Sequence, residues 1–457
     1  MIMVNYDYSI VDASKQQVLF QIGTKGSGKS SFGELVCSTL YSFGWTVLDI
    51  WASDNLENAF WCISEKCKDK PEVTDCDCYR RIPITLLAPE YILYDQNRVD
   101  AFNDRYFSRE PLVEIVKLPR PTATANSTIN RRIQEIFRDT VLHCRDHRRV
   151  LVFNPKMFPD EKDAFRTLEV LIRKLGDIAY HDFNRLEPED CNPPKKSRSE
   201  MTNFEKCRDK MIVLIRECGE IAPSSRLKTD QSGQSVLVKK ALLQFIRKVR
   251  HYQISLCTDF QNMMDVESSI RSQCDQWTLR RITKRLAGEE WSWLFKQIDD
   301  TRKRIAQDYG GGVKGYVRAD KWFPKIEELK QNQAYVIYSN DHVRLWNVGM
   351  PPFHHKKPFE KWEKITGIEF DFDESVLTAK GVQEEGKTTD KIIFSLCFEK
   401  RNPKNGKRWD FDKIRDYLAD EQENGNLTWN VPFKNMKVDT FRANYRRWSK
   451  KYEGDGK

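Results

Sequence analysis

Short apolar runs alternate with longer segments of helical periodicity over most of the chain. Val18–Ile22 and Met211–Ile215 have the near-continuous apolar character of buried parallel strands. A helix is expected after the first run, and a helix over residues 236–251 precedes another short strand at 254–258. The apolar residues of the first helix recur at helical spacing: Phe32, Leu35, Val36 and Leu40. This alternation predicts an α/β fold with a mostly parallel sheet.

The carboxyl-terminal third of the pattern is different. Residues 334–339 and 343–348 predict a hairpin that closes the core, and residues 371–390 lack apolar periodicity, as a linker does. Three helical segments are expected beyond it, at 391–399, 411–421 and 438–450. We therefore predict a core over residues 1–370 with an insertion around 55–120, a linker over 371–390, and a small basic helical domain over 391–457.

Composition limits the classes of protein that fit this pattern. The 457 residues are 39% hydrophobic and 31% charged, which supplies a large core but excludes a membrane-embedded body. No apolar run approaches the ~20 residues of a bilayer span, and residues 1–16 lack the blocks of a signal peptide. The 12 cysteines are scattered, which favours reduced thiols or a metal site over a disulfide framework. We expect a cytoplasmic protein with no membrane partner.

The segment between the first strand and the first helix carries the clearest chemical motif. Its residues fit G-x-x-x-x-G-K-[ST] at every fixed position: Gly23, Thr24, Lys25, Gly26, Ser27, Gly28, Lys29 and Ser30. Glycines let backbone N–H groups close around phosphates at a helix N-terminus, and Ser31 continues the same turn. Lys29 is expected to contact the β- and γ-phosphates, and the Ser30 hydroxyl to bind Mg²⁺. The motif predicts ATP as ligand, because the Asn-Lys-x-Asp element of GTPases is absent.

Two residues at the ends of later strands are candidates for hydrolysis. Glu217 follows the strand Met211–Ile215, where a carboxylate can act as catalytic base towards the attacking water. The alternative is a glutamate that merely ends a strand at the surface. Gln261 follows the next strand and is a candidate to hold that water or to sense the γ-phosphate. A glutamine in a loop is otherwise simply solvated.

This order of motifs resembles the HerA/FtsK superfamily of P-loop ATPases, which form rings that pump DNA. The resemblance is carried by Gly23–Ser30, the strand and glutamate within 212–223, the basic segment 247–255, Gln261 and the segment 269–274. It implies a RecA-like (ASCE) P-loop NTPase core, ATP and Mg²⁺, double-stranded DNA as partner, and a homo-oligomer, as a hexamer. It also implies an arginine that completes the neighbouring subunit's site, for which Arg250 and Arg280 are the candidates. Plain surface arginines are the alternative for both.

The sequence departs from the family at one informative position. Family members commonly have Asp-Glu where this chain has Arg216-Glu217, so the acid that supports Mg²⁺ is missing and a cation stands in its place. Two consequences remain open: hydrolysis is slow, or Ser30 and water hold the metal alone.

Four cysteines and three basic residues form the remaining candidate sites. Cys62, Cys67, Cys76 and Cys78 could hold a structural Zn²⁺, although C-x-C is tighter than the usual knuckle, and unligated thiols are the alternative. The last helix is expected to bury Phe441, Tyr445 and Trp448. Its opposite side then presents three DNA-binding candidates: Arg442, Arg446 and Lys450. A helix-turn-helix-like DNA contact and a solvated basic helix are both consistent with this face.

Two functions fit these features. The first is an ATP-driven translocase that moves double-stranded DNA through a ring, with a nuclease or other DNA-processing protein as a further partner. The second is a non-motor ATP-binding switch or scaffold, in which Arg216 leaves binding intact but turnover poor, and the basic tail recruits a protein partner. ATPase activity that DNA stimulates would distinguish them.

Overall fold

The chain divides into two compact units, Met1–Asp371 and Phe372–Lys457, which are described separately. The computed structural model describes residues 11, 16–24, 26–51, 56–63, 82–106, 110–122, 127–183, 210–221, 233–249, 254–261, 272–282, 292–338, 342–348, 362–373, 393–394, 396–398, 409–423 and 433–452. Within this part of the chain, no helix is both long and apolar enough to cross a membrane.

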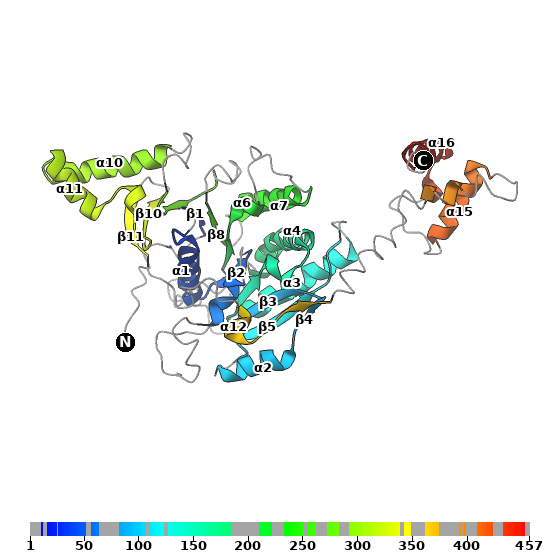
Figure 1. Cartoon of the computed structure of the whole chain (residues 1–457), viewed down its shortest axis with the longest axis horizontal. Helices are drawn as coiled ribbons and strands as arrows, with labels where there is room; N and C mark the ends of the chain where they lie inside the picture. Colours follow the sequence, from blue (N-terminus) through cyan, green and yellow to red (C-terminus); the bar gives the residue numbers. More distant parts are fainter. Residues whose placement is uncertain are drawn as a thin grey trace, which may run out of the picture. The chain divides into compact units, whose positions relative to one another are not determined.

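The first unit is built on a ten-stranded sheet with the order β11-β10-β9-β1-β8-β7-β2-β6-β3-β5 (Figure 1). Pairing is parallel from β9 to β5, whereas β10 runs antiparallel to both β9 and β11. The strands are β1 (Val18–Ile22), β2 (Thr46–Ile50), β3 (Ile84–Pro89), β5 (Val113–Leu118), β6 (Val150–Phe153), β7 (Met211–Ile215), β8 (Ile254–Phe260), β9 (Gln276–Leu279), β10 (Gln333–Tyr338) and β11 (Val343–Asn347). The predicted α/β fold with a mostly parallel sheet is confirmed.

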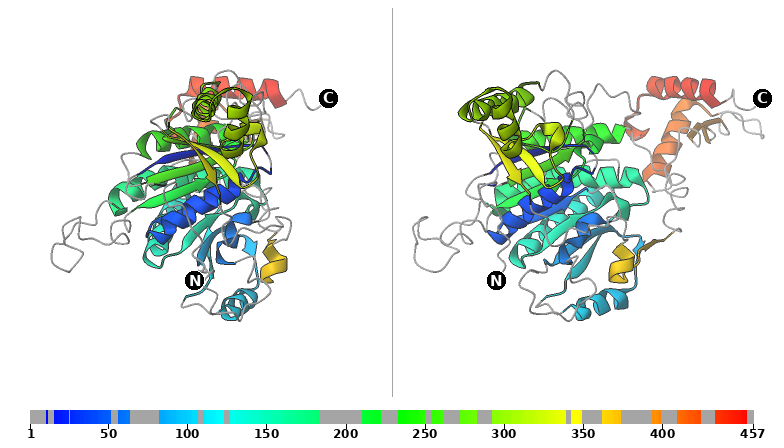
Figure 2. Two further views of the ribbon diagram at one scale, coloured as in Figure 1. Left: turned by 90° about the vertical axis from the view of Figure 1, so that its left-hand side faces the viewer. Right: turned by 60° about the vertical axis from the view of Figure 1, so that its left-hand side comes forward.

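The central strands are buried along their whole length because helices cover both faces of the sheet. Helix α1 (Lys29–Ser42) contacts β8, β7 and β2 on one face, and α3 (Thr128–Asp146), α4 (Glu161–Ile178) and α7 (Gly233–Val249) pack in a row on the other (Figures 1 and 2). This placement of the helices on two faces follows from right-handed crossovers. The chain moves along the sheet in one direction from β1 to β2, and in the reverse direction from β5 through β6 and β7 to β8, so the connecting helices lie on opposite faces.

The region expected to be an insertion, residues 55–120, extends the main sheet. It contains the 3₁₀ turn η1 (Glu57–Cys62), then β3, β4 (Ile92–Leu93), α2 (Gln96–Arg105) and β5. Strands β3 and β5 pair with each other, and β3 pairs with β6. Strand β12 (Asp371–Phe372), at which the first unit ends, pairs with β4, and α12 (Trp362–Thr366) precedes it. Residues 374–390 of the predicted linker lie outside the described residues.

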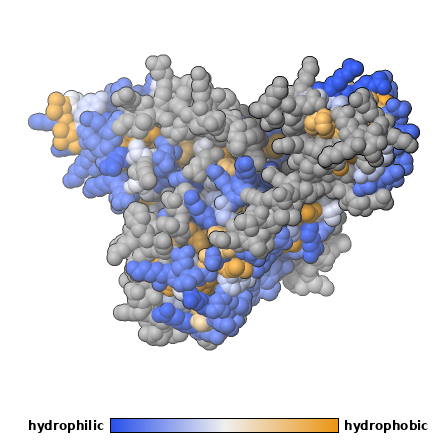
Figure 3. Space-filling model, turned by 45° about the vertical axis from the view of Figure 1, so that its right-hand side comes forward, coloured by the Kyte–Doolittle hydropathy of each residue, from blue (hydrophilic) through white to orange (hydrophobic). Residues whose placement is uncertain are grey.

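Between β9 and β10 the chain forms a helical hairpin of α10 (Ser292–Asp308) and α11 (Gly312–Trp322). Residues 309–311 form a tight turn between the two helices. Positive φ angles at Gly310, Gly311 and Gly312 explain why this turn consists of glycines. The hairpin exposes large apolar side chains, and an apolar patch lies at the upper left of Figure 3, where the hairpin lies in Figure 1. The exposed apolar side chains of the hairpin are Trp293, Tyr309, Val313, Tyr316, Val317 and Trp322, and Val313 is 82% exposed.

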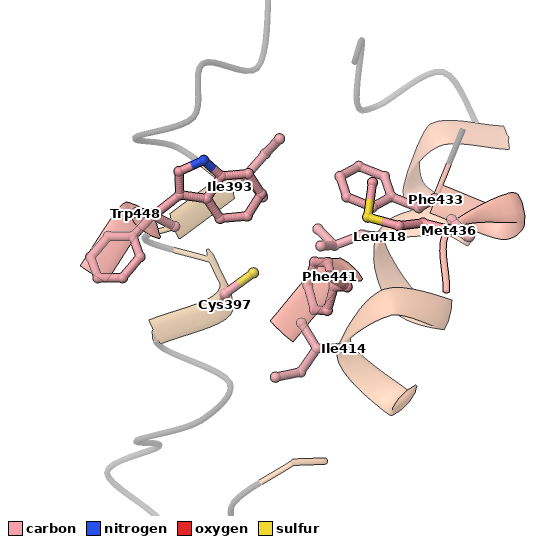
Figure 4. Close-up of a cluster of buried hydrophobic side chains, with 10 residues drawn as sticks. Ile393, Cys397, Ile414, Leu418, Phe433, Met436, Phe441 and Trp448 are labelled. Carbon is pink, nitrogen blue, oxygen red and sulfur yellow. The ribbon is translucent and has the colours of Figure 1, made fainter. Parts of the chain in front are cut away.

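The second unit has its own hydrophobic core (Figure 4). Helices α15 (Phe411–Glu423) and α16 (Val438–Tyr452) start where the sequence predicts, and the short turn η7 (Phe433–Asn435) connects to α16. Residues 393–394 and 396–398 are also helical. The buried side chains from all of these segments are Ile393, Phe394, Cys397, Ile414, Leu418, Ala419, Phe433, Met436, Phe441 and Trp448. The predicted helical carboxyl-terminal region is therefore present.

Candidate nucleotide site

A glycine-rich loop connects the carboxyl end of β1 to the first turn of α1. Gly26 and Gly28 have φ angles of 73° and 86°, in the left-handed region that favours glycine. Gly28 is the N-cap of α1, and it supplies no side-chain acceptor for the first N–H groups of the helix. These N–H groups, together with the positive end of the helix dipole, form the kind of cradle that binds phosphate.

Gly23, the first residue of this loop, is fixed by packing. A Cβ at this position would lie 2.4 Å from Ser27 Oγ and 2.6 Å from Arg280 Cβ, which real side chains essentially never approach. Ser27 is 3% exposed, and its hydroxyl has no hydrogen-bond partner among the described residues. The loop is therefore closely packed around Gly23, while the Ser27 hydroxyl remains available for a ligand.

Gln21 holds the start of α1 from below. Its side chain is fully buried in β1, and its amide, oriented to satisfy both neighbours, donates to Lys29 O at 2.8 Å and accepts from Gly33 N at 3.1 Å. Sequence reasoning did not single out this residue. A polar side chain within the otherwise apolar strand Val18–Ile22 was the available signal.

Lys29 folds back onto the loop that carries it. Its Nζ donates to Gly23 O at 3.0 Å and to Thr24 O at 3.4 Å, and the residue is 8% exposed. Burial lowers the pKa of the ammonium group, whereas the charges of Asp259 and Glu217 act to raise it. The two loop carbonyl groups thus accept hydrogen bonds from the ammonium group, and phosphate oxygens of a bound nucleotide would take their place.

The two carboxylates whose charges act on Lys29 come from the neighbouring strands β8 and β7. Strand β8 lies between β1 and β7, so the carboxyl ends of all three strands meet at one edge of the sheet. Glu217 follows β7 and is half-buried, with a φ of 50° that is unusual for a residue other than glycine. Its backbone N–H donates to Asp259 Oδ1 at 2.9 Å.

Asp259 is the site residue that sequence reasoning missed. The strand was expected to end at Thr258, with Asp259 in the following loop, but β8 continues to Phe260 and carries Asp259 within it, 2% exposed. Burial raises the pKa of its carboxyl group, and the charge of Lys29 opposes that shift. A charged residue at the end of an apolar run was the signal that this carboxylate points into the site.

The charge of Arg216 is paired with two buried carboxylates, and it also acts to lower the pKa of Asp259. Its guanidinium lies within a buried cluster, with Nη2 2.7 Å from Asp49 Oδ2 and Nη1 2.7 Å from Glu34 Oε1. The Trp61 indole N–H also donates to Asp49 Oδ2 at 2.7 Å. Arg216 therefore joins β7 to β2 and α1, and the effect of this cation on metal binding and hydrolysis stays a prediction.

Arg280 also makes its hydrogen bonds within its own chain. The residue is 1% exposed, and its guanidinium donates to Gly28 O at 2.5 Å and to Gln331 O and Gln333 O, each at 3.1 Å. Burial lowers its pKa to about 10, so the group remains a cation near neutral pH. In its own chain, Arg280 thus holds the phosphate loop, and a role of this residue towards a neighbouring subunit stays a prediction.

The remaining candidates are exposed, buried without metal-ligating neighbours, or outside the described residues. Gln261 follows β8 and is exposed. Arg250 lies outside the described residues, as do Lys25, Cys67, Cys76 and Cys78. Cys62 is 1% exposed in η1 and lies 3.5 Å from Ala59 O, and burial raises the pKa of its thiol, which opposes the thiolate that zinc requires. The described residues contain no group of three or more metal-ligating side chains.

The site has the donors that Mg²⁺ prefers. Ser30 lies half-buried in the first turn of α1, and the carboxylates of Asp259 and Glu217 approach from β8 and β7. Hydroxyl and carboxylate oxygens with room for water are the usual magnesium environment. The residues present therefore fit a magnesium-bound nucleotide.

The last helix of the second unit separates apolar from basic side chains. Phe441 and Trp448 are buried in the core of that unit, while Arg442 and Arg446 are exposed. Arg442 lies 3.3 Å from the exposed Asp439 carboxylate one turn earlier, and the Lys450 side chain lies outside the described residues. The exposed face of α16 is thus basic over the part that the structure describes.

Comparison with known proteins gives structural matches only. No family model and no curated protein sequence matches the chain. The genome packaging NTPase B204 from Sulfolobus turreted icosahedral virus 2, in complex with ATP-gammaS, is 11% identical, with 74% of this chain and 99% of that chain covered and a TM-score of 0.32. VirB4 of Thermoanaerobacter pseudethanolicus is 11% identical, with 76% and 94% covered and a TM-score of 0.35. The pCW3 conjugation coupling protein TcpA is 10% identical, with 74% and 62% covered and a TM-score of 0.31.

These matched structures are ATPases of the HerA/FtsK type, the group that the sequence motifs resemble. At such low identities and TM-scores, they carry no inference about activity. The fold class is that of P-loop NTPases, and it rests on this chain's own features: a parallel sheet, a glycine-rich loop between β1 and α1, and a lysine at the start of that helix.

Proposed function

We propose that this chain binds ATP with Mg²⁺ and hydrolyses it. One observation carries the proposal: Lys29 is buried at the start of α1, held by the loop carbonyls, and it experiences the charges of Asp259 and Glu217. A buried lysine, a helix N-terminus and two carboxylates at one sheet edge form a site that binds a polyphosphate and can activate water beside it.

Each residue has a distinct task in this proposal. Lys29 exchanges the carbonyls of Gly23 and Thr24 for the β- and γ-phosphates, and the first N–H groups of α1 hold the β-phosphate. Mg²⁺, when bound, supplies positive charge to the phosphate oxygens, with the Ser30 hydroxyl among its ligands. Glu217 accepts a proton from the attacking water. Arg280 keeps the loop in shape through its bond to Gly28 O.

We further propose that hydrolysis drives the movement of double-stranded DNA through a ring of subunits, as a hexamer. B204 is described as a DNA-packaging ATPase, and that description applies to B204. In this chain, the proposal is supported by the exposed Arg442 and Arg446 on α16 and by the exposed apolar surface of the α10–α11 hairpin. A large exposed apolar surface favours association with another protein surface, here a second copy of the chain.

The test is the rate of ATP hydrolysis with and without duplex DNA, measured on size-fractionated protein. We expect activity in an oligomeric fraction, stimulation by duplex DNA of any sequence, and no activity in Lys29→Ala. Lys162→Ala, which removes an exposed lysine from α4, is the matched control. Tight ATP binding with negligible turnover that DNA does not change would instead support the non-motor switch. Failure of the wild-type protein to bind ATP would exclude both functions.

A further inference from the structure

The described part of the first unit contains four buried carboxylates, and they differ in how their charge is balanced. They are Glu34, Asp49, Asp163 and Asp259, each at most 4% exposed. Arg216 pairs with the first two at 2.7 Å each, and Arg120 Nε lies 2.8 Å from Asp163 Oδ2. Asp259 is the exception, because it forms no ion pair with any described residue.

Among the described residues, the Asp259 side chain accepts one hydrogen bond, from the backbone N–H of Glu217 to Oδ1. Its second carboxylate oxygen has no partner among the described residues. A buried carboxylate without a cation is costly, since desolvation of an ion in a protein interior amounts to several kcal/mol. The positive charges of Lys29 and, to a smaller extent, Arg216 favour the ionised carboxylate, and Lys29 is the group that a bound nucleotide would engage.

The position of Asp259 in the sheet places it beside the phosphate loop. It is in register with Gln21 on β1, the residue that holds the first turn of α1, and it is joined to Glu217 on the other side. Arg216 is the residue at the position where an acid was expected, and its guanidinium is turned to Asp49 and Glu34. Among the described residues at this sheet edge, the fully buried acid without an ion pair comes from β8, and the half-buried Glu217 follows β7.

We propose that Asp259 supports the Mg²⁺ ion of the bound nucleotide, in place of the acid that is absent at position 216. The two acidic functions of the site are then divided between strands: Glu217 from β7 activates water, and Asp259 from β8 supports the metal. The hydrogen bond from Glu217 N–H to Asp259 keeps the two groups in a fixed relation. This inference rests on the proposed nucleotide binding, and it explains how the chain tolerates Arg216.

The test compares nucleotide binding with and without metal in Asp259→Asn, a nearly isosteric change that keeps an acceptor for Glu217 N–H. Binding of ATPγS is measured at a series of Mg²⁺ concentrations and in EDTA. We expect the half-saturating Mg²⁺ concentration to rise roughly 10-fold to 100-fold, while affinity in EDTA is unchanged or higher. Asp163→Asn, which alters a buried carboxylate away from the site, should leave the Mg²⁺ dependence unchanged. Unaltered Mg²⁺ dependence in Asp259→Asn would overturn the inference.

Thermal unfolding without nucleotide supplies a second readout. Because Asp259 is a buried and unpaired charge, Asp259→Asn should have an equal or higher Tm than the wild-type protein. A marked fall in Tm would identify Asp259 as a structural acid and would also overturn the inference. If the wild-type protein binds no nucleotide under any condition, the proposed function itself fails, which is a distinguishable result.

Discussion

Arg216 and Asp49 are joined by two hydrogen bonds, from Nη2 to Oδ2 at 2.7 Å and from Nε to Oδ1 at 3.3 Å. Arg216 directly follows β7 and Asp49 lies in β2, so this pair connects adjacent parallel strands behind the phosphate site. Glu34 of α1 shares the same guanidinium. The positive charge at this position is thereby paired with the buried carboxylates of Asp49 and Glu34.

We predict that Arg216→Met destabilises the protein by about 3–5 kcal/mol, because Asp49 and Glu34 remain buried without their cation. Urea unfolding measures the change. The triple variant Arg216→Met, Asp49→Asn, Glu34→Gln should recover most of the loss, since replacing a whole buried ionic cluster by neutral groups is far less costly than breaking it. A single variant as stable as the wild type would contradict this account.

The same variant should respond to pH in a defined direction. Burial already raises the pKa of Asp49, and removal of Arg216 removes the charge that opposes this shift. A carboxyl group whose pKa is higher in the folded state binds protons more readily there, so the folded state gains stability as pH falls. The deficit of Arg216→Met should therefore be smaller at pH 5 than at pH 8. An equal deficit at both values would argue against buried carboxylates as its cause.

Glu217→Gln should retain ATP binding while turnover falls by roughly 100-fold or more, because a glutamine cannot accept the proton of the attacking water. The backbone N–H of residue 217 remains available to Asp259, so the structure of the site should persist. Single-turnover hydrolysis and equilibrium binding separate the two effects. If Glu220→Gln is the damaging change instead, the assignment of the base along this segment is wrong.

Arg280→Ala should weaken nucleotide binding in each isolated subunit, because it removes three hydrogen bonds that fix the phosphate loop and the segment around Gln331. Hydrogen bonds from a charged donor contribute about 1.5–3 kcal/mol each when they are buried. Binding measured at protein concentrations too low for association tests this, with Arg281→Ala as the exposed neighbouring control. Normal binding in dilute Arg280→Ala, with activity lost only in the assembled protein, would restore a role between subunits.

Removal of Arg442, Arg446 and Lys450 should weaken DNA binding through phosphates without changing sequence preference. Each phosphate contact contributes about 0.9 to the slope of log affinity against log salt, so the triple alanine variant should flatten that slope by roughly two to three. Buried Phe441 and Trp448 keep α16 folded in this variant. A control that removes three exposed basic residues of the first unit, Arg131, Arg132 and Lys162, should leave the slope unchanged. A wild-type slope in the α16 variant would show that this face is only solvated.

Local pattern was sufficient for the phosphate loop and for several of the strands and helices. Strand, glycine-rich loop and helix are consecutive in sequence, so Gly23–Ser30 could be assigned from spacing and side-chain type alone. The strand Met211–Ile215 and the helices at 411 and 438 followed in the same way from apolar periodicity. Backbone hydrogen bonding and the burial of one face act over a few residues, and such features are visible in a single sequence.

The roles of the charged residues depended on contacts that no local pattern encodes. Arg216 and Asp49 are hydrogen-bonded although they are 167 residues apart in the sequence, and Arg280 and Gly28 are hydrogen-bonded although they are 252 residues apart. The order of strands places β8 between β1 and β7, and this order decides that Asp259 lies next to Lys29 and Glu217. A long polar side chain can adopt several directions from the same backbone, and the charges and carbonyls within its reach select one. The sequence by itself therefore determined the phosphate loop and several of the α/β elements, whereas tertiary structure alone decided which acid lies near Lys29 and which arginines are buried in the core.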